Sequence, residues 1–297
     1  MENFSTQHKS NIMGQKNRFV EDGKLKLSCL PVSLFSDIIN RRLTIAEWAE
    51  LGRKIGLDGV DISLLFLENH CPAYLGKLSK ALEKTGVPLI MATAYPDFTN
   101  PDPVQRKREL DYLRRDIALS SQLRIRYLRV LAGQAHPATS RSAGIKWAVE
   151  NLSFADETAR EYGMQLLYEN HSKPGAWDYY DFSYPLDIFL QILEGIRDTG
   201  IRINFDTANI AALGQDPLTV LAQVYDRVET VHVSDTAEKG TFQPVLVGTG
   251  VVAFEQIFRY LKSRRFDNWL CIEEASFSGA EGIRKAADFT RRTWEAA

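Results

Sequence analysis

The chain has 297 residues, 44% of them hydrophobic and 25% charged, which is typical of a globular protein with a large apolar core. Its net charge of −2 argues against a large phosphate-binding surface, and three scattered cysteines without a CxxC spacing exclude a disulfide framework and a thiolate zinc site. No apolar run is long enough to cross a membrane and the first residues lack the apolar block of a signal peptide, so we expect a cytoplasmic protein that binds neither membranes nor nucleic acid.

Residues 1–24 are polar and are predicted to form a flexible extension, followed by one domain of residues 25–297. In that domain short apolar runs alternate with longer amphipathic stretches, which indicates alternating strands and helices. Strands are predicted at residues 25–30, 59–63, 88–93, 126–131, 165–169, 202–206, 230–234 and 270–274. Helices are predicted at residues 44–55, 72–85, 102–122, 142–162, 184–197, 216–224, 253–263 and 280–295.

Several predicted helix starts carry capping residues. Thr44 is followed three positions later by Glu47, which is the pattern of a capping box. Asp102 and Asp216 each precede a proline, so each predicts a cap followed by proline at the first helical position.

Eight strand–helix units with mostly uninterrupted apolar strands predict a parallel sheet covered by helices. Eight is the number at which such a sheet closes, so we predict an α/β fold with a single (β/α)8 TIM barrel. A doubly wound open sheet is the alternative. It is disfavoured because no GxGxxG follows the first strand and no domain break interrupts the count.

Acids and histidines gather where the later strands end, and in a barrel these ends form the active face. The fifth strand ends at Glu169, the sixth at Asp206, the seventh contains His232 and the eighth ends near Glu273. Taken singly, Asp206 could be a helix cap, His232 a core histidine, and Glu273 the partner of an Arg or Lys. Three carboxylates on one rim repel each other unless a cation compensates them. The oxygen-rich set suits one divalent metal ion, Mn²⁺, Mg²⁺ or Co²⁺, with Zn²⁺ also possible.

Glu274 competes with Glu273 for the last position of this set. Strand alternation lets only one of the two side chains face the barrel interior.

The ordered set Glu169, Asp206, His232 and Glu273 resembles the metal site of the xylose-isomerase-like barrel superfamily. The segment "HVSD", followed by "VGTGVVAFEQIF" at residues 247–258, resembles more narrowly the sugar phosphate isomerase/epimerase group. The resemblance covers roughly residues 25 to 295 and favours Glu273 over Glu274. It implies that the four residues bind the cation. It also implies that Glu169 and Glu273 act as acid and base on opposite faces of a sugar, sugar phosphate or related polyol ketone, through an enediolate.

The sequence also departs from the resembling ketose 3-epimerases. Asn209 stands where they often carry histidine, Gly175 where they tend to have glutamate, and Glu238 and Lys239 near their arginine. The reaction therefore stays open between an isomerase or epimerase, an inosose-like dehydratase and a non-catalytic sugar-binding barrel. Endonuclease-IV-like hydrolysis is disfavoured by only five histidines and the negative net charge.

Five residues are candidates for binding the substrate. His171 could bond a hydroxyl or support a metal ligand, Asn209 takes the place of the family histidine, and Trp177 could stack on a sugar face. Lys239 could reach a phosphate or carboxylate. Arg129 could meet an anionic group, or could instead pair with a rim carboxylate. Asp235 could orient His232 or a water. Because resembling proteins commonly associate, a homo-oligomer is also possible.

Overall fold

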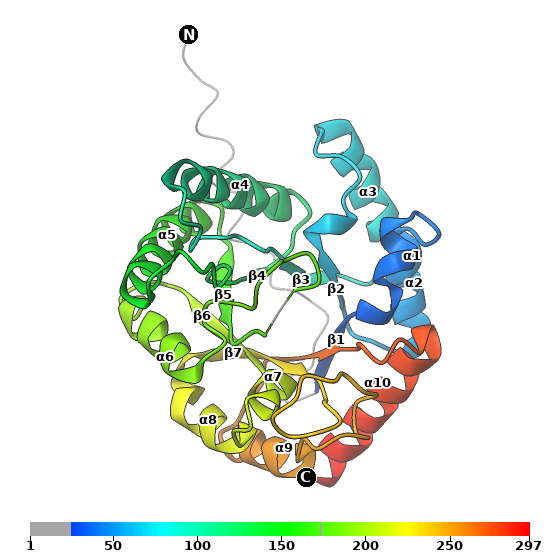
Figure 1. Cartoon of the computed structure of the whole chain (residues 1–297). Helices are drawn as coiled ribbons and strands as arrows, with labels where there is room; N and C mark the ends of the chain where they lie inside the picture. Colours follow the sequence, from blue (N-terminus) through cyan, green and yellow to red (C-terminus); the bar gives the residue numbers. More distant parts are fainter. Residues whose placement is uncertain (1–24, 173) are drawn as a thin grey trace.

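The computed structural model describes residues 25–172 and 174–297, so the predicted extension at 1–24 lies outside the described residues. Eight parallel strands form a nearly closed barrel, which Figure 1 shows along its axis. The predicted TIM barrel is confirmed. The strands are β1 (Lys26–Leu30), β2 (Val60–Ser63), β3 (Leu89–Thr93), β4 (Tyr127–Val130), β5 (Gln165–Glu169), β6 (Arg202–Asp206), β7 (Val228–Val233) and β8 (Trp269–Glu273).

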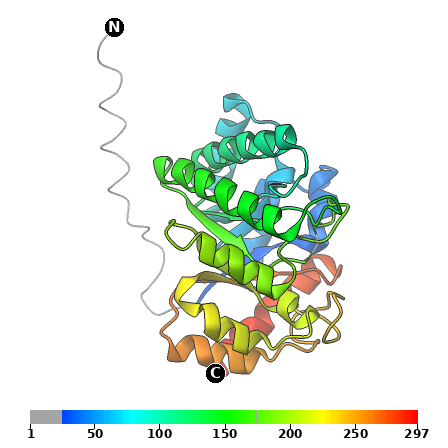
Figure 2. The same ribbon diagram turned by 60° about the vertical axis from the view of Figure 1, so that its left-hand side comes forward.

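Helices surround the barrel, as the turned view in Figure 2 shows. They are α2 (Ile45–Ile55), α3 (Pro72–Thr85), α4 (Pro103–Gln122), α5 (Arg141–Glu161), α6 (Leu186–Gly195), α8 (Pro217–Val224), α9 (Phe254–Ser263) and α10 (Gly279–Ala296). Short elements that the sequence did not predict are η1 (Val32–Leu34), α1 (Phe35–Ile39), η2 (Leu64–Phe66), α7 (Thr207–Ala212) and η3 (Tyr225–Arg227). Every described helix is too short or too polar to cross a bilayer.

The predicted caps are present. The Thr44 hydroxyl accepts a hydrogen bond from the amide of Glu47 at 3.2 Å, and the Glu47 carboxylate accepts one from the amide of Thr44 at 2.8 Å. Asp102 and Asp216 accept hydrogen bonds from the first-turn amides of α4 and α8. The chain therefore enters these helices where the sequence indicates.

Within the described residues, β1 and β2 are the neighbouring strands that share no ladder, although β1 pairs with β8 and β2 with β3. Polar groups close this seam. The amide of Asp58 donates to the Leu27 carbonyl at 2.8 Å, and the Leu27 amide donates to the Asp58 carboxylate at 3.0 Å. Asp61 on β2 accepts from the Ser28 hydroxyl at 2.6 Å and from the Met91 amide at 3.1 Å. Side chains thus complete the ring.

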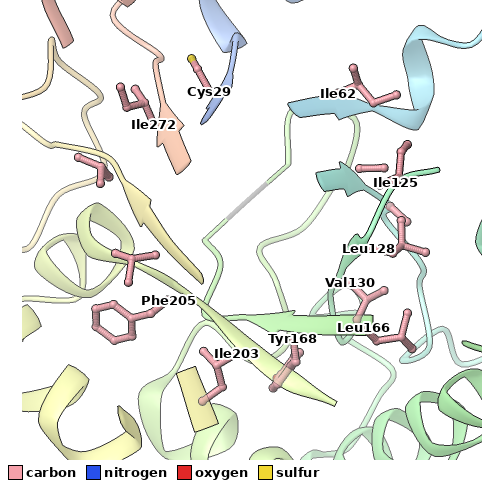
Figure 3. Packing of buried hydrophobic residues seen from close by; sticks show 14 of the residues in the cluster. Cys29, Ile62, Ile125, Leu128, Val130, Leu166, Tyr168, Ile203, Phe205 and Ile272 are labelled. Carbon is pink, nitrogen blue, oxygen red and sulfur yellow. The ribbon is translucent and has the colours of Figure 1, made fainter. Parts of the chain in front are cut away.

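Most of the core lies between the strands and the helices. Figure 3 shows side chains such as Cys29, Leu128 and Phe205 pointing away from the barrel interior. A smaller cluster of Ile90, Met91, Tyr127, Leu167, Trp269 and Cys271 includes the apolar residues of the interior. Because side chains alternate along a strand, the interior positions after Leu167 and Cys271 are Glu169 and Glu273. The pleat therefore carries the rim acids inward.

Most neighbouring helices pack against each other, but no comparable packing joins α6 and α8 or joins α3 and α4, and the latter two stand apart in Figure 1. A cavity of about 370 Å³ opens between α4 and the segment of η2 and the loop after it, with Leu65, Tyr95, Tyr112 and Asp116 among its lining residues. Leu65 is 54% exposed there. Burial raises the pKa of Asp116 to about 6. The barrel wall is therefore open on the side of β2 and β3.

Candidate metal site

The structure brings together the four residues that the sequence places on the rim of strands five to eight. Glu169, Asp206, His232 and Glu273 each offer one ligand atom, and these atoms all lie within 4.8 Å of one another. The Nδ1 atom of His232 lies 2.6 Å from Glu169 Oε1, 2.8 Å from Glu273 Oε2 and 3.8 Å from Asp206 Oδ2. These are the donor types of a site for a divalent cation.

Sheet register explains why the four side chains converge. Asp206 on β6 is paired with His232 on β7, so both side chains reach the same height of the barrel. Glu169 and Glu273 are the last residues of β5 and β8. Since the carboxyl ends of parallel strands meet at one face, the four residues form one group despite their separation in sequence.

Asp206 serves two purposes with its two oxygens. Oδ1 accepts a hydrogen bond from the Asn209 amide at 2.7 Å and caps α7, while Oδ2 accepts from the Ser234 hydroxyl at 2.9 Å and faces His232. Asn170 holds its backbone, accepting from the Asp206 amide at 3.0 Å and donating to the Asp206 carbonyl at 2.8 Å. Oδ1 of Asp206 therefore acts as the helix cap that the sequence suggested, and Oδ2 is the oxygen that faces the cluster.

Glu169 is fully buried and held from two sides. Its Oε1 accepts from the Asn204 amide group at 2.8 Å, and its Oε2 lies 3.0 Å from Nε of Arg129. The Thr230 hydroxyl donates to Asn204 at 2.6 Å and fixes its orientation. Arg129 is 1% exposed, and its guanidinium lies 4.7 Å from the ring centre of Tyr95. Of the two sequence interpretations of Arg129, the structure shows the pairing with a rim carboxylate.

The pKa values of the Glu169 and Asp206 carboxyl groups reflect how closely charged groups are packed in the cluster. Burial tends to raise the pKa of Glu169, but His232 and Arg129 outweigh it and lower that pKa to about 2. Burial, together with Glu273 and Glu169, raises the pKa of Asp206 well above its usual range. Metal ligation requires ionised carboxylates and a neutral imidazole. In that state three carboxylates and the Arg129 guanidinium carry two negative charges in total, which a single divalent cation would neutralise. The donor set and its charge therefore fit such an ion.

Glu274 lies outside the cluster. Its side chain is buried, and its Oε1 accepts a hydrogen bond from the Ser276 amide at 2.9 Å. A Cβ atom added at Gly282 would come within 2.9 Å of the same oxygen, so Glu274 points toward the start of α10. Glu273 is therefore the glutamate whose side chain reaches His232.

The other candidates lie at different distances from the cluster. His171 and Asn209 are buried and line one small cavity, and burial lowers the pKa of His171 to about 4. Trp177 is largely buried in the loop after β5, where its amide donates to the Pro174 carbonyl. Lys239 is exposed in the loop after β7. A hydrogen bond from Thr219 is the main cause of the lowered pKa of Asp216, and the positive charge of Lys239 lowers that pKa further.

Asp235 organises the loop after β7, and within the described residues it forms no hydrogen bond or ion pair with His232. Its carboxylate accepts hydrogen bonds from the backbone amides of Thr236, Gly248, Gly250 and Val252 at 2.8–3.2 Å. A Cβ atom at Gly250 would collide with the Thr236 carbonyl. The glycines of the "VGTGVV" segment thus allow its backbone to wrap around one carboxylate.

Sequence reasoning missed several residues that support the cluster: Asn170, Asn204, Ser234 and Tyr95. Asn204 had a detectable signal, because it stands two positions before Asp206 and so faces the same side of the strand. The others gave none, since their contacts depend on loop geometry.

A family model described as Xylose isomerase-like TIM barrel matches residues 49–293. Among curated proteins, an inosose dehydratase of Lacticaseibacillus casei is 23% identical over 135 residues, which cover 39% of this chain and 42% of that protein. An inosose dehydratase of Bacillus thuringiensis (strain Al Hakam) is 23% identical over 164 residues, covering 48% and 52%. The chain thus spans about half the length of the curated relatives it matches.

Among solved structures, a D-tagatose 3-epimerase-like protein has a TM-score of 0.74 at 16% identity, covering 92% of this chain and 98% of that chain. At such low identity the likeness shows the fold alone. Because the family match extends over most of the sequence, the chain belongs to the xylose isomerase-like TIM barrel family.

Proposed function

We propose that this protein is a divalent-metal-dependent isomerase or epimerase acting on a sugar, sugar phosphate or related polyol ketone. The observation that carries the proposal is the buried cluster of Glu169, Asp206, His232 and Glu273, whose ligand atoms lie within 4.8 Å of one another. Its charge calls for a cation, and its position at the carboxyl ends of the strands is where barrel enzymes carry out their chemistry. The family supports a substrate that resembles a sugar.

The four residues of the cluster would hold the cation. A divalent ion placed there withdraws electrons from a ketone and its neighbouring hydroxyl, which makes the adjacent C–H bond more acidic. Mn²⁺, Mg²⁺ and Co²⁺ suit the three carboxylates and one imidazole, and Zn²⁺ is also compatible.

A carboxylate of the same cluster would take the proton from that C–H bond. Glu169 and Glu273 reach the cluster from β5 and β8, and their oxygens contact the same nitrogen of His232. His171 and Asn209 are buried, and within the described residues His171 Nδ1 and Asn209 Oδ1 have no hydrogen-bond partner, which makes both residues candidates for bonding substrate hydroxyls. We expect Trp177 and Lys239 to contribute more distant contacts from their loops.

A dehydratase is the second candidate, favoured by the inosose dehydratases that match about half of the chain. The same proton removal would then be followed by loss of the hydroxyl on the next carbon as water. The two reactions need the same cluster and differ in what leaves the substrate.

The test combines metal analysis with isotope exchange. The purified protein is expected to contain a divalent metal, and to exchange deuterium from solvent into the carbon beside the carbonyl of a ketose or cyclic keto-polyol. A product lighter by one water identifies the dehydratase, and a product of unchanged mass the isomerase or epimerase. Absence of exchange across a panel of ketoses, keto-polyols and their phosphates would contradict both and leave a sugar-binding barrel.

A further inference from the structure

The two glutamates of the cluster have unequal surroundings. Glu169 is fully buried, and each of its oxygens already has a partner: Asn204 and His232 at Oε1, and Arg129 at Oε2. In Glu273 the Oε2 atom lies 2.8 Å from His232, and its side chain is 17% exposed. Its contact with His232 is made through Oε2, and within residues 25–172 and 174–297 its Oε1 takes part in no hydrogen bond or ion pair. Both oxygens of Glu169 therefore have partners, whereas only one oxygen of Glu273 does.

Arg129 is the residue that holds Glu169 in these surroundings. Its guanidinium is buried beneath the rim on β4, stacks on Tyr95 and contacts Glu169 through Nε. Arginine stays charged in proteins, and its planar group is held in place by a ring face and a carboxylate together. Oε2 of Glu169 is therefore held beside a buried cation in an ion pair.

We infer that Arg129 is a positioning residue that fixes Glu169 as a metal ligand and withdraws it from proton transfer, so that Glu273 is the glutamate that takes the substrate proton. This inference rests on the proposed function for its substrate. It modifies the paired roles that the family resemblance implies, because epimerisation by Glu169 and Glu273 on opposite faces no longer fits.

The proton steps balance with one carboxylate. The C–H bond beside the carbonyl breaks, its electron pair forms a C=C bond, the carbonyl oxygen takes up the charge, and Glu273 receives the proton. In an isomerisation Glu273 returns this proton to the neighbouring carbon, while the hydroxyl proton moves to the former carbonyl oxygen. In a dehydration the proton joins the departing hydroxyl, which leaves as water.

Mn²⁺ binding to chelator-treated protein tests the role of Arg129 without any substrate. Arg129→Lys keeps the positive charge but places a methylene where Nε contacts Glu169. We expect it to weaken Mn²⁺ binding about tenfold or more in calorimetry, as loss of a partner that orients a ligand typically does. The melting temperature checks the fold, and Tyr95→Leu, which removes the stacking ring, tests the same point if Arg129→Lys does not fold. Mn²⁺ affinity within twofold of wild type would overturn the positioning role.

Deuterium exchange tests the role of Glu273. At Mn²⁺ concentrations that saturate the variant, as checked by calorimetry, Glu273→Gln is expected to slow exchange into a ketose or keto-polyol by about 100-fold or more, the usual effect of losing a positioned acid or base. Glu274→Gln is the matched control, because Glu274 is buried nearby but lies outside the cluster, and it should keep the exchange. Exchange that survives Glu273→Gln would overturn the assignment. If wild-type protein incorporates no deuterium into any substrate of the panel, the proposed function is wrong. The Mn²⁺ affinity of Arg129→Lys still tests the role of Arg129 in that case, because that measurement needs no substrate.

Discussion

The two halves of the barrel differ in how their strands end. In the second half, β5, β6 and β8 end in carboxylates and β7 carries His232, and the ladder through these strands is unbroken. In the first half the strands end in Leu30, Ser63, Thr93 and Val130, which carry no charge. That half also contains the seam between β1 and β2 and the cavity between η2 and α4.

The charged strand ends of the second half and the uncharged ones of the first half place different structural requirements on the barrel. Ligand atoms must be held to within a fraction of an ångström, so they stand on strands whose neighbours are paired on both sides. The first half instead leaves a cavity of about 370 Å³ that is lined by residues of η2, α4 and the loops after η2 and β3. Arg129 on β4 lies at the border and reaches from the first half to Glu169 in the second.

The largest expected effect is loss of metal from Asp206→Asn. Asparagine caps helices about as well as aspartate, so α7 should persist while the charge at Oδ2 disappears. Metal affinity, measured by elemental analysis and Mn²⁺ titration, should fall by more than the 10- to 100-fold typical of an outer hydrogen-bond partner. Glu274→Gln is the matched control, buried nearby but outside the cluster, and should keep the metal. If Asp206→Asn keeps the metal and Glu274→Gln loses it, the four-residue site is wrong.

Asp61 at the seam makes a prediction about pH. Burial raises its pKa to about 6, above the value near 3.9 of an unfolded aspartate, so the folded chain prefers the neutral acid. The stability that Asp61 adds is complete below about pH 4 and is lost as pH rises through about 6, up to about 3 kcal/mol. Urea unfolding of wild type and Asp61→Asn from pH 4 to 8 should show this loss in wild type alone. Parallel curves would contradict it.

Removing the metal should destabilise the second half of the barrel. A ligand present at 100 times its dissociation constant stabilises the folded state by about 2.7 kcal/mol, so chelation should lower the melting temperature by several degrees. Returning Mn²⁺ should restore it. Asp206→Asn serves as the control, since its melting temperature should not respond to either treatment. An equal response in that variant would place the ion elsewhere.

The smallest effect is expected at the cavity of the first half. Leu65 is 54% exposed, so Leu65→Ser should change the free energy of unfolding by no more than about 0.5 kcal/mol and leave metal content unchanged. Any change should instead appear in KM once a substrate is known. Loss of metal from this variant would show that the two halves are not separable.

Much of the fold could be predicted because the strands are short apolar runs whose limits are set by polar residues. All eight were predicted with ends within two residues of the observed ones. The same alternation placed Glu169, Asp206 and Glu273 at strand ends, which predicted their convergence. The short helix α7 was missed because its residues are buried on every side, so they show no amphipathic period.

The remaining features depend on contacts between distant segments. The seam requires Asp58 and Asp61 to meet β1, and sequence periodicity cannot show which neighbouring strands lack a ladder. Similarly, Arg129 offered two partners until the packing of β4 against β5 placed it beside Glu169. The choice of Glu273 over Glu274 came from the family resemblance, because strand alternation shows only that one of the two side chains faces the interior. The structure agrees with that choice.

Asp206 also links the ion to the dynamics of the chain. Helix α7 has only six residues, too few to be stable alone, and its first amides are held by Asp206 and by Ser234, which also contacts the Asp206 carboxylate. Whatever fixes this carboxylate therefore raises the free energy needed to open α7 locally. Amide hydrogen exchange in α7 should slow when the ion binds, making this helix an internal reporter of occupancy.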